Sequence, residues 1–339
     1  MFIFQKKYLI AFFSILLICC MFLFYIIFLY KNDRIELLSL PILLVEENKE
    51  ETENYFAYDI SELYDGNPWK EEWNIKTLPV FYNTELRNRK KKNIDKREKI
   101  QSKIKVLEQI AKKFGVTNRN TMLYDTWNVF LENKDYSFQM NFYQDILLIK
   151  FKKFVELPFI YEKESKEQAE KVISYFIDTY KDCFDWKEAE KALYCWYDIY
   201  GEKYFSLYAY KKGNTLEEEL LNYHFNRAYL MIGEKNEIRA IFFRKTDLSE
   251  KIGEYPIITT EQAQQLLQSQ TYISVLGNTF SQNMTLVKTE LVYRDSIYDS
   301  IFMPYYKFFV QLPEIEENGL HHYDVYYIPA VQEQYLKFD

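Results

Sequence analysis

The chain is poor in glycine, proline, histidine and cysteine. Among its 339 residues there are 8 Gly, 8 Pro, 3 His and 4 Cys. Loops that cradle phosphate need glycines at fixed spacings, and neither G-x-G-x-x-G nor G-x-x-x-x-G-K occurs in the sequence. The composition therefore excludes the common nucleotide-binding loops and leaves few ligands for a metal centre. We expect no cofactor and no metal site.

Aromatic residues are abundant instead, with 31 Tyr and 27 Phe. Tyrosine and phenylalanine favour β-strands, and scarce glycine leaves few strained loops. The formal net charge is −7, whereas proteins that bind duplex DNA usually carry a basic surface. We therefore expect no nucleic-acid partner.

An uncharged run extends from Tyr8 to Tyr30, 23 residues inclusive. As a helix it would be about 35 Å long, enough to cross a bilayer. No small-residue cleavage site follows it, which disfavours a cleaved signal peptide; lipidation at Cys19 or Cys20 is the other alternative. Lysines in the tail 1–7 predict a signal-anchor, with that tail cytoplasmic and the rest outside. Membrane lipid is thus an expected partner, and the predicted location is a single-pass protein of the cell membrane.

Beyond the predicted span, the sequence divides into a connector or stalk at 31–95, an ectodomain at 96–250 and a C-terminal unit at 255–339. Three segments show the apolar periodicity of helices. They are Ile100–Phe114, Ser165–Tyr180 and Thr259–Ser269. Ser165 with Gln168, and Thr259 with Gln262, have the spacing of a helix-capping box.

Between these helices lie segments rich in aromatic and β-branched residues, which predict strands. They are Met122–Phe130, Tyr136–Phe142, Ile146–Phe154, Ala192–Tyr200, Lys203–Tyr210, Asn222–Ile232, Glu237–Arg244, Leu286–Tyr293, Tyr305–Leu312 and Tyr323–Ile328. Helices separated from runs of antiparallel strands predict an α+β fold, a transmembrane helix followed by helix-plus-sheet units.

Two helix starts share the form cap-x-Glu-Gln-Ala, at Ser165–Ala169 and at Thr259–Ala263. Each is followed by predicted antiparallel strands. Duplication of a helix-plus-strands unit would explain this, and so would the shared requirements of any good helix start. The sequence leaves both explanations open.

Several residues are of types that can bind a metal, form a disulfide or take part in catalysis, and each also has an ordinary structural explanation. His321 and His322 are adjacent in a predicted strand, so their rings point to opposite faces and cannot share a metal. Cys183 and Cys195 are either a disulfide or two buried thiols, and we favour the thiols. We predict no catalytic, cofactor-binding or metal-binding residues, and therefore no enzyme.

Two charged segments can likewise be interpreted either as binding sites or as solvated surface. Glu314, Glu316 and Glu317 form an acidic loop that could bind a cation or pair as acid and base, although hairpin loops are commonly charged to stay solvated. The basic run Arg87–Lys92 could meet anionic headgroups or wall polymers, or simply be a solvated helix entrance.

The strand Tyr305–Leu312 alternates strongly. Tyr306, Phe308, Val310 and Leu312 share one face, which we expect to lie beneath the helix at Thr259–Ser269. Lys307 and Gln311 share the other face, which we expect to be accessible; a partner protein is expected to dock on this face or on an edge of the sheet. Phe176 and Phe308 are expected to be core residues.

The segments Leu291–Arg294, Met303–Val310 and Tyr323–Val331, together with the helix start at Thr259, resemble the helix-then-strands unit of PepSY-like domains. The chain is also similar to exported, membrane-anchored accessory proteins that restrain cell-wall sensor kinases in Gram-positive bacteria. The resemblance covers about the last 80 residues and the topology. It implies a non-enzymatic, extracytoplasmic regulatory or protein-interaction protein of the cell envelope, partnered by another envelope or membrane protein. A module that binds cell-wall glycan or polymer is the alternative, and an envelope hydrolase a third.

Overall fold

The described part of the chain is mainly β-sheet. Of the residues that the computed structural model describes, 44% lie in strands and 25% in helices. The structure describes residues 40–46, 55–63, 65–90, 96–117, 122–124, 128–141, 146–198, 200–234, 236–270, 272–274, 277–281, 283–296, 298–315 and 318–338. Of the segment Met1–Leu43 this includes only the last four residues, and the fold below is that of Leu44–Asp339, which packs as one unit.

Two sequence predictions are corrected by this structure. The α+β class is wrong, because strands outweigh helices and short segments such as Tyr55–Ala57 and Lys251–Pro256 add to the sheets. Within the described ranges, no helix is long and apolar enough to cross a bilayer. The structure therefore contradicts the predicted N-terminal transmembrane helix and the predicted location as a single-pass, signal-anchored membrane protein. The predicted span Tyr8–Tyr30 itself lies outside the described residues.

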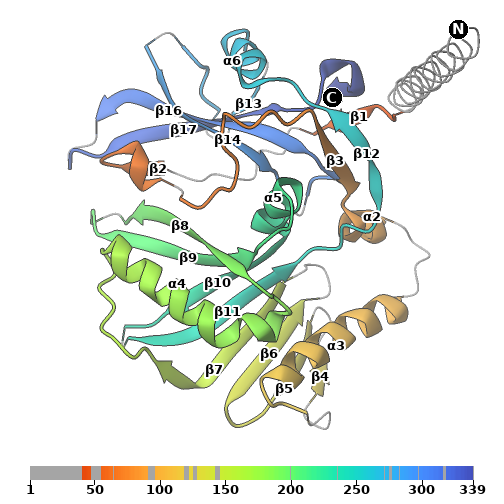
Figure 1. The fold of residues 1–339 in the computed structure, drawn as a ribbon, viewed down its shortest axis with the longest axis vertical. Coiled ribbons are helices and arrows are strands. Elements are labelled where there is room, and N and C mark those ends of the chain that lie inside the picture. The colour runs from red at the N-terminus through yellow and green to blue at the C-terminus, as the bar shows by residue number, and fades with distance from the viewer. Residues whose placement is uncertain are drawn as a thin grey trace, which may run out of the picture. The chain divides into compact units, whose positions relative to one another are not determined.

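The larger sheet has eight antiparallel strands in the order β4-β5-β6-β7-β11-β10-β9-β8 (Figure 1). Their bounds are β4 Met122–Tyr124, β5 Asn128–Glu132, β6 Tyr136–Asn141, β7 Ile146–Glu156, β8 Ala189–Tyr197, β9 Lys203–Lys211, β10 Asn226–Ile232 and β11 Glu237–Lys245. Each half of the sheet is a meander of four strands that follows a helix, α3 (Lys96–Lys113) or α4 (Lys166–Tyr180). The halves join where β7 pairs with β11.

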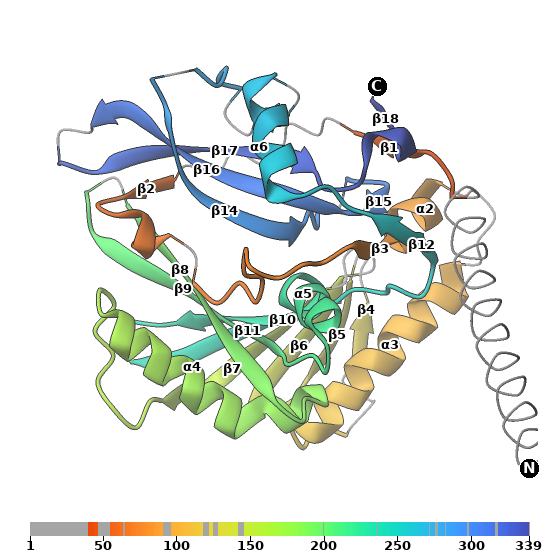
Figure 2. The same cartoon turned by 45° about the horizontal axis from the view of Figure 1, so that its top comes forward.

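Helices α3 and α4 cover the outer face of this sheet (Figure 2). On α4, the residues with helical spacing are all buried: Ala169, Val172, Ile173, Phe176 and Tyr180. The Ser165 side chain caps the helix by accepting a hydrogen bond from the Gln168 amide at 3.3 Å. The predictions of α3 and α4, and of Phe176 as core, are confirmed.

The smaller sheet has five strands, in the order β13-β17-β16-β14 with β2 paired to β17. Their bounds are β2 Tyr55–Ala57, β13 Ile273–Ser274, β14 Thr285–Tyr293, β16 Pro304–Ile315 and β17 His321–Pro329. Helix α6 (Thr260–Gln268) lies on one face, and its predicted capping box between Thr259 and Gln262 is present. Ala263 and Leu267, on the buried side of α6, share a hydrophobic core with Tyr306, Phe308 and Val310 of β16, as predicted.

Two small sheets complete the fold. One has the order β12-β3-β15, with β3 Thr77–Tyr82, β12 Lys251–Pro256 and β15 Ile301–Phe302. The other pairs β1 (Leu43–Val45) with β18 (Leu336–Phe338). Helix α2 spans Thr84–Lys90, and the 3-10 turns are η1 Ile60–Glu62, η3 Lys181–Phe184 and η4 Glu333–Tyr335.

Residues from the segment assigned to a connector lie between the two large sheets (Figure 1). Asp65 exchanges two backbone hydrogen bonds with Leu193 of β8, each 2.8 Å long. Gly66 has φ +99°, and a Cβ there would lie 2.3 Å from the Lys191 carbonyl oxygen, so only glycine fits. Trp69 is buried against the smaller sheet, where its ring meets Tyr306 edge-on.

One predicted strand is half wrong. Residues Asn222–Ile232 were expected to be extended, but helix α5 runs from Leu216 to Phe225 and β10 begins at Asn226. Thr215 caps the helix, and Glu217, Glu218 and Glu219 in its first turn favour the positive end of the helix dipole. The predicted strand Met122–Phe130 is likewise two strands, β4 and β5.

We predict that Phe308→Ala and Phe176→Ala each lower the free energy of unfolding by about 3–5 kcal/mol, because both side chains are fully buried. Phe154 of β7 is 51% exposed, so Phe154→Ala should change it by less than about 1 kcal/mol. Urea titration measures all three. Equal losses at exposed and buried positions would contradict this description of the core.

Candidate functional site

The histidine pair predicted to face opposite ways has separate partners. His321 Nδ1 lies 3.0 Å from Gln311 Nε2. The ring of His322 stacks on Phe56 of β2, with centroids 4.4 Å apart. Among the described residues, no group of three or more His, Cys, Asp or Glu side chains could hold a metal ion.

Cys183 and Cys195 are free thiols, which confirms the interpretation as unbridged cysteines. Burial raises the pKa of both, and that of Cys195 reaches about 12. Because the thiolate is the reactive form, both are poor nucleophiles at neutral pH.

The two charged segments are only partly described. Glu314 is the second-to-last residue of β16. Glu316 and Glu317 lie outside the described residues. Arg87 belongs to α2, where it pairs with Glu250 at 2.5 Å and covers the Tyr82 ring at 4.3 Å. Residues 91–92 of the basic run lie outside the described part of the chain.

The face of the smaller sheet that bears Lys307 is covered, so the predicted docking face is wrong. Lys307 is 6% exposed. Its Nζ lies 4.8 Å from the centre of the Phe309 ring and 5.0 Å from that of Tyr55, and donates to the Tyr55 hydroxyl at 3.3 Å. This face packs toward the larger sheet, as the edge-on contact of Tyr55 with Tyr194 of β8 shows.

A polar cavity of about 180 Å³ lies on this covered side, next to α5. We call it the interior cavity. Its lining comes from α5, β10, β14, β16 and β17: Tyr223, His224, Arg227, Glu290, Val292, Tyr293, Arg294, Asp295, Lys307 and Tyr327. Both large sheets therefore contribute charged groups to one interior space.

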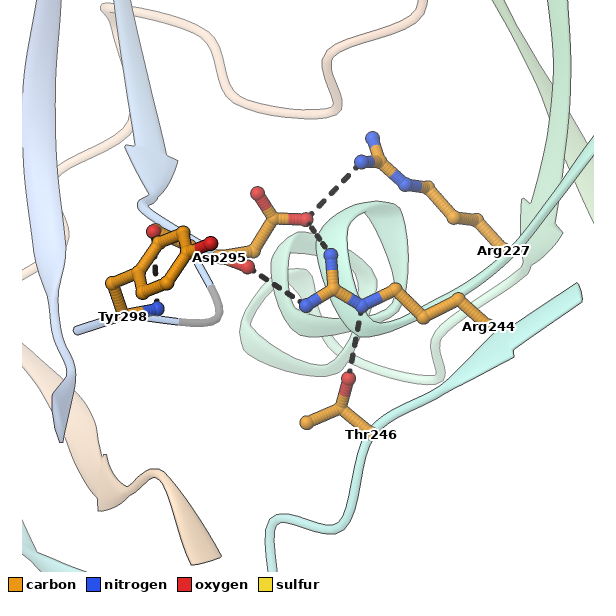
Figure 3. A network of polar contacts seen from close by, with 6 residues as sticks. Arg227, Arg244, Thr246, Asp295 and Tyr298 are labelled. Carbon is orange, nitrogen blue, oxygen red and sulfur yellow. Dashed lines mark hydrogen bonds and ion pairs between the residues drawn. The ribbon is translucent and has the colours of Figure 1, made fainter. Parts of the chain in front are cut away.

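Asp295 is the centre of an ion-pair network across the two sheets (Figure 3). Its Oδ2 lies 3.1 Å from Arg227 Nη2 of β10 and also pairs with Arg244 of β11. Arg244 donates further to the Asp295 carbonyl at 2.8 Å and to Thr246 Oγ1 at 3.1 Å. Burial by itself would raise the pKa of Asp295, but the two guanidiniums outweigh it and the pKa is lowered.

The network is anchored at the end of β14. Asp295 is the second residue after the strand, and nearby the Tyr298 amide donates to Ser296 Oγ at 3.2 Å (Figure 3). Glu290 of β14 pairs with Lys288 at 2.7 Å. Asp295 and Glu290 therefore each form an ion pair with a cationic side chain. This arrangement is not that of an acid–base pair of carboxylates for hydrolysis.

His224 is the unusual member of the lining. It is 7% exposed, and its Nε2 has no hydrogen-bond partner among the described residues. Burial lowers its pKa to about 3; Asp295 opposes the shift, and Arg227, Lys307 and Arg244 add to it. The ring is therefore neutral at physiological pH, and an unpaired buried nitrogen costs free energy.

Sequence reasoning missed the interior cavity for identifiable reasons. His224 and Arg227 fell in a segment predicted to be one strand, which concealed the helix α5. Lys307 was assigned to solvent because a lysine in an alternating strand usually is exposed. The one available signal was the charge in and just after β14: Lys288 and Glu290 alternate on a strand otherwise rich in apolar residues, and Arg294 follows its last residue.

A second feature lies at the surface, at the turn between β8 and β9. Three aromatic residues lie there, which we call the turn surface: Trp196, Tyr200 and Tyr204. Tyr200 is 83% and Trp196 38% exposed. The rings of Trp196 and Tyr204 stack with centroids 4.7 Å apart.

We predict that Lys307→Glu destabilises the protein by about 3–5 kcal/mol, because it removes a buried cation and places a second carboxylate directly across from Glu290, against buried aromatic rings. Lys307→Met keeps the volume of the stem and should cost less. Thermal and urea unfolding of both variants test this. A silent Lys307→Glu would contradict the burial of this face.

We predict that His224 makes stability fall on acidification. Its pKa is about 3 in the folded protein and 6.5 ordinarily. Below pH 6.5 the unfolded chain binds the proton while the folded protein does not, so stability is lost as pH falls toward 3. Between pH 6.5 and 5 the loss is about 2 kcal/mol. The variant His224→Phe should lack this part of the pH dependence; identical pH profiles for both proteins would contradict it.

Comparison with known proteins identifies no relative by sequence: no family model matches the chain, and no curated protein matches it.

Proposed function

We propose that this chain is a non-enzymatic regulatory protein that works by binding another protein, and that the turn surface makes the contact. The observation that carries the proposal is the group of exposed Tyr and Trp side chains at the β8–β9 turn. Tryptophan and tyrosine are the residues most enriched where binding energy concentrates in protein interfaces.

The turn surface is held in place before any partner arrives. Asp198 accepts hydrogen bonds from the Tyr200 and Glu202 amides at 2.8 and 2.9 Å, and Gly201 takes the left-handed conformation that closes the turn. The Tyr204 hydroxyl donates to Glu202 at 2.7 Å. The Trp196 and Tyr204 rings, already stacked on each other, lose little conformational entropy on binding, which favours affinity.

The charges around the turn surface indicate a basic partner. Three carboxylates lie there, Glu62, Asp198 and Glu202, against the ammonium groups of Lys163 and Lys203. Glu62 and Lys203 pair with each other at 2.6 Å. The remaining excess is negative, as is the whole chain at −7, and complementary charge on a partner would speed and orient association.

Glycan binding is the second candidate, and the stacked pair of Trp196 and Tyr204 favours it. An exposed indole offers a flat apolar face to a sugar ring, and the nearby carboxylates of Asp198 and Glu202 accept hydrogen bonds from hydroxyls. The two candidate functions use the same residues, so the identity of the bound molecule, a protein or a glycan, distinguishes them.

A photo-crosslinking residue at position 200 tests the proposal in the native cell. It should capture one basic protein; the same residue at position 154, an exposed aromatic site on β7, should not. With the captured protein purified, Trp196→Ala should weaken binding at least tenfold, and added salt should weaken it further.

Unchanged affinity in Trp196→Ala, or equal capture from positions 154 and 200, would contradict the proposal. Competition by soluble glycan, with binding of glycan lost in Trp196→Ala, would establish the second candidate instead. A thermal melt of Trp196→Ala serves as the folding control, because this side chain is only partly buried.

A further inference from the structure

We propose that the larger sheet binds a linear, uncharged oligosaccharide on its inner face, the face opposite α3 and α4. This surface is separate from the turn surface and does not depend on the function proposed above. On the inner face, β2 packs against β8, and α5 packs against β9 and β10 (Figure 1). Six inward-pointing side chains across the sheet are partly exposed, and we call them the open face: Phe130, Gln139, Leu148, Tyr208, Tyr229 and Phe242.

A row of apolar side chains forms most of the open face. Four of them lie directly opposite one another on neighbouring strands: Tyr208 of β9, Tyr229 of β10, Phe242 of β11 and Leu148 of β7. The rings of Tyr208 and Tyr229 have centroids 5.1 Å apart, and those of Tyr229 and Phe242 5.8 Å apart. Met231, at the next inward position of β10, is 40% exposed. Water-facing positions of an antiparallel sheet are usually polar, so an exposed row of this kind indicates a binding surface.

Amide side chains continue the row toward the edge of the sheet. Gln139 of β6 lies opposite Leu148, and Phe130 of β5 lies opposite Gln139. Beside them, Asn128 Oδ1 accepts hydrogen bonds from Gln139 Nε2 at 3.3 Å and from Asn141 Nδ2 at 3.1 Å. An amide group can both donate and accept hydrogen bonds, as a sugar hydroxyl does. The open face therefore presents apolar rings and hydrogen-bonding groups side by side.

The charges around the open face are largely neutralised within the protein. Glu132 forms an ion pair with Lys152, and Asp295 binds the inward-pointing arginines of β10 and β11. Lys150 of β7 is exposed and adds one ammonium group, which can donate to a hydroxyl oxygen. A strongly charged ligand would find little complementary charge here, so these groups favour an uncharged one.

A sugar chain combines the chemistry that this surface matches. A pyranose ring has apolar faces of C–H groups and an edge of hydroxyls, so it can pack on aromatic rings while its hydroxyls reach the amides. Protein interfaces concentrate apolar area at their centre, whereas here an amide lies within the row.

The length and shape of the row define the kind of sugar chain. Strands are spaced about 4.8 Å apart, so the row from β9 to β5 is about 24 Å long and suits an extended chain of several sugar units. Chains of β-1,4-linked hexoses form flat ribbons, whereas α-1,4-linked hexoses coil. An open sheet surface therefore favours the β-1,4-linked chain.

The test is calorimetric titration of the full chain with three uncharged hexasaccharides: cellohexaose, chitohexaose and maltohexaose. At least one of the two β-1,4-linked chains should bind saturably, and added salt should leave its affinity unchanged because the ligand carries no charge. Maltohexaose, which is α-1,4-linked, should bind at least about tenfold more weakly. The proposal is overturned if neither β-1,4-linked chain binds, or if maltohexaose binds equally well.

Variants locate the site. Tyr229→Thr removes a ring from the middle of the row but keeps a residue that favours strands, so it should weaken binding at least about tenfold. Tyr229→Phe keeps the ring and should bind within about threefold of the natural protein. The matched control, Phe338→Thr, removes a 44% exposed ring from β18 and should bind as the natural protein does. Equal losses in Tyr229→Thr and Phe338→Thr, or a loss in Trp196→Ala without one in Tyr229→Thr, would overturn the proposal.

A measurement on the natural protein decides the question if Tyr229→Thr does not fold. A diazirine derivative of the hexasaccharide that binds should crosslink to peptides of β10 and β11, and labelling confined to other elements would overturn the proposal. Light scattering tests the other occupant of such a surface. A dimer that Phe242→Lys separates into monomers would show that a second copy of the chain covers the open face, and the proposal would then be wrong.

Discussion

The structure depends on how the two large sheets pack face to face. Neither inner face is purely apolar: aromatic rings from β2, β8 and β16 meet there together with buried cations. Tyr55 is in edge contact with both Tyr194 and Phe309, and Lys307 lies against the rings of Tyr55 and Phe309. Cation–π contacts of this kind partly replace the hydration that a buried ammonium loses. The layer therefore holds charges that a hydrocarbon core would not tolerate.

The packing of the two sheets also explains why polar groups are buried beside α5. Helix α5 lies between the sheets, in contact with both β10 and β14. The gap is filled by charged groups, and Asp295 joins the sheets through Arg227 and Arg244. A buried ion pair of this sort adds little net stability but fixes geometry, because breaking one partner leaves the other charged and unpaired. The arrangement thus positions the two sheets and shapes a cavity between them.

The helix-then-strands plan occurs three times. Helices α3 and α4 each precede a four-strand meander, and α6 precedes the strands of the smaller sheet. The first two units share one continuous sheet through the pairing of β7 with β11, whereas the third packs its inner face against theirs. The cap-x-Glu-Gln-Ala similarity linked only α4 and α6, which belong to different sheets. Inner faces that pack together leave the ends of the strands, such as the β8–β9 turn, as the exposed aromatic surface.

Local pattern by itself determined the elements whose stability is local. The helices α3, α4 and α6, the caps at Ser165 and Thr259, and the two faces of β16 follow from periodicity and short-range hydrogen bonds, which depend on neighbours in sequence. Tertiary structure decided the rest. Strand alternation shows that Lys307 and Phe308 face opposite ways, but not that both faces are covered, because what covers a face comes from distant residues such as Tyr55. Likewise an acidic segment can be a solvated stalk or, as around Gly66, a strand partner between sheets. Helix α5 and the charges that surround His224 were not readable for the same reason: they are stabilised by contacts across two sheets that the order of residues does not reveal.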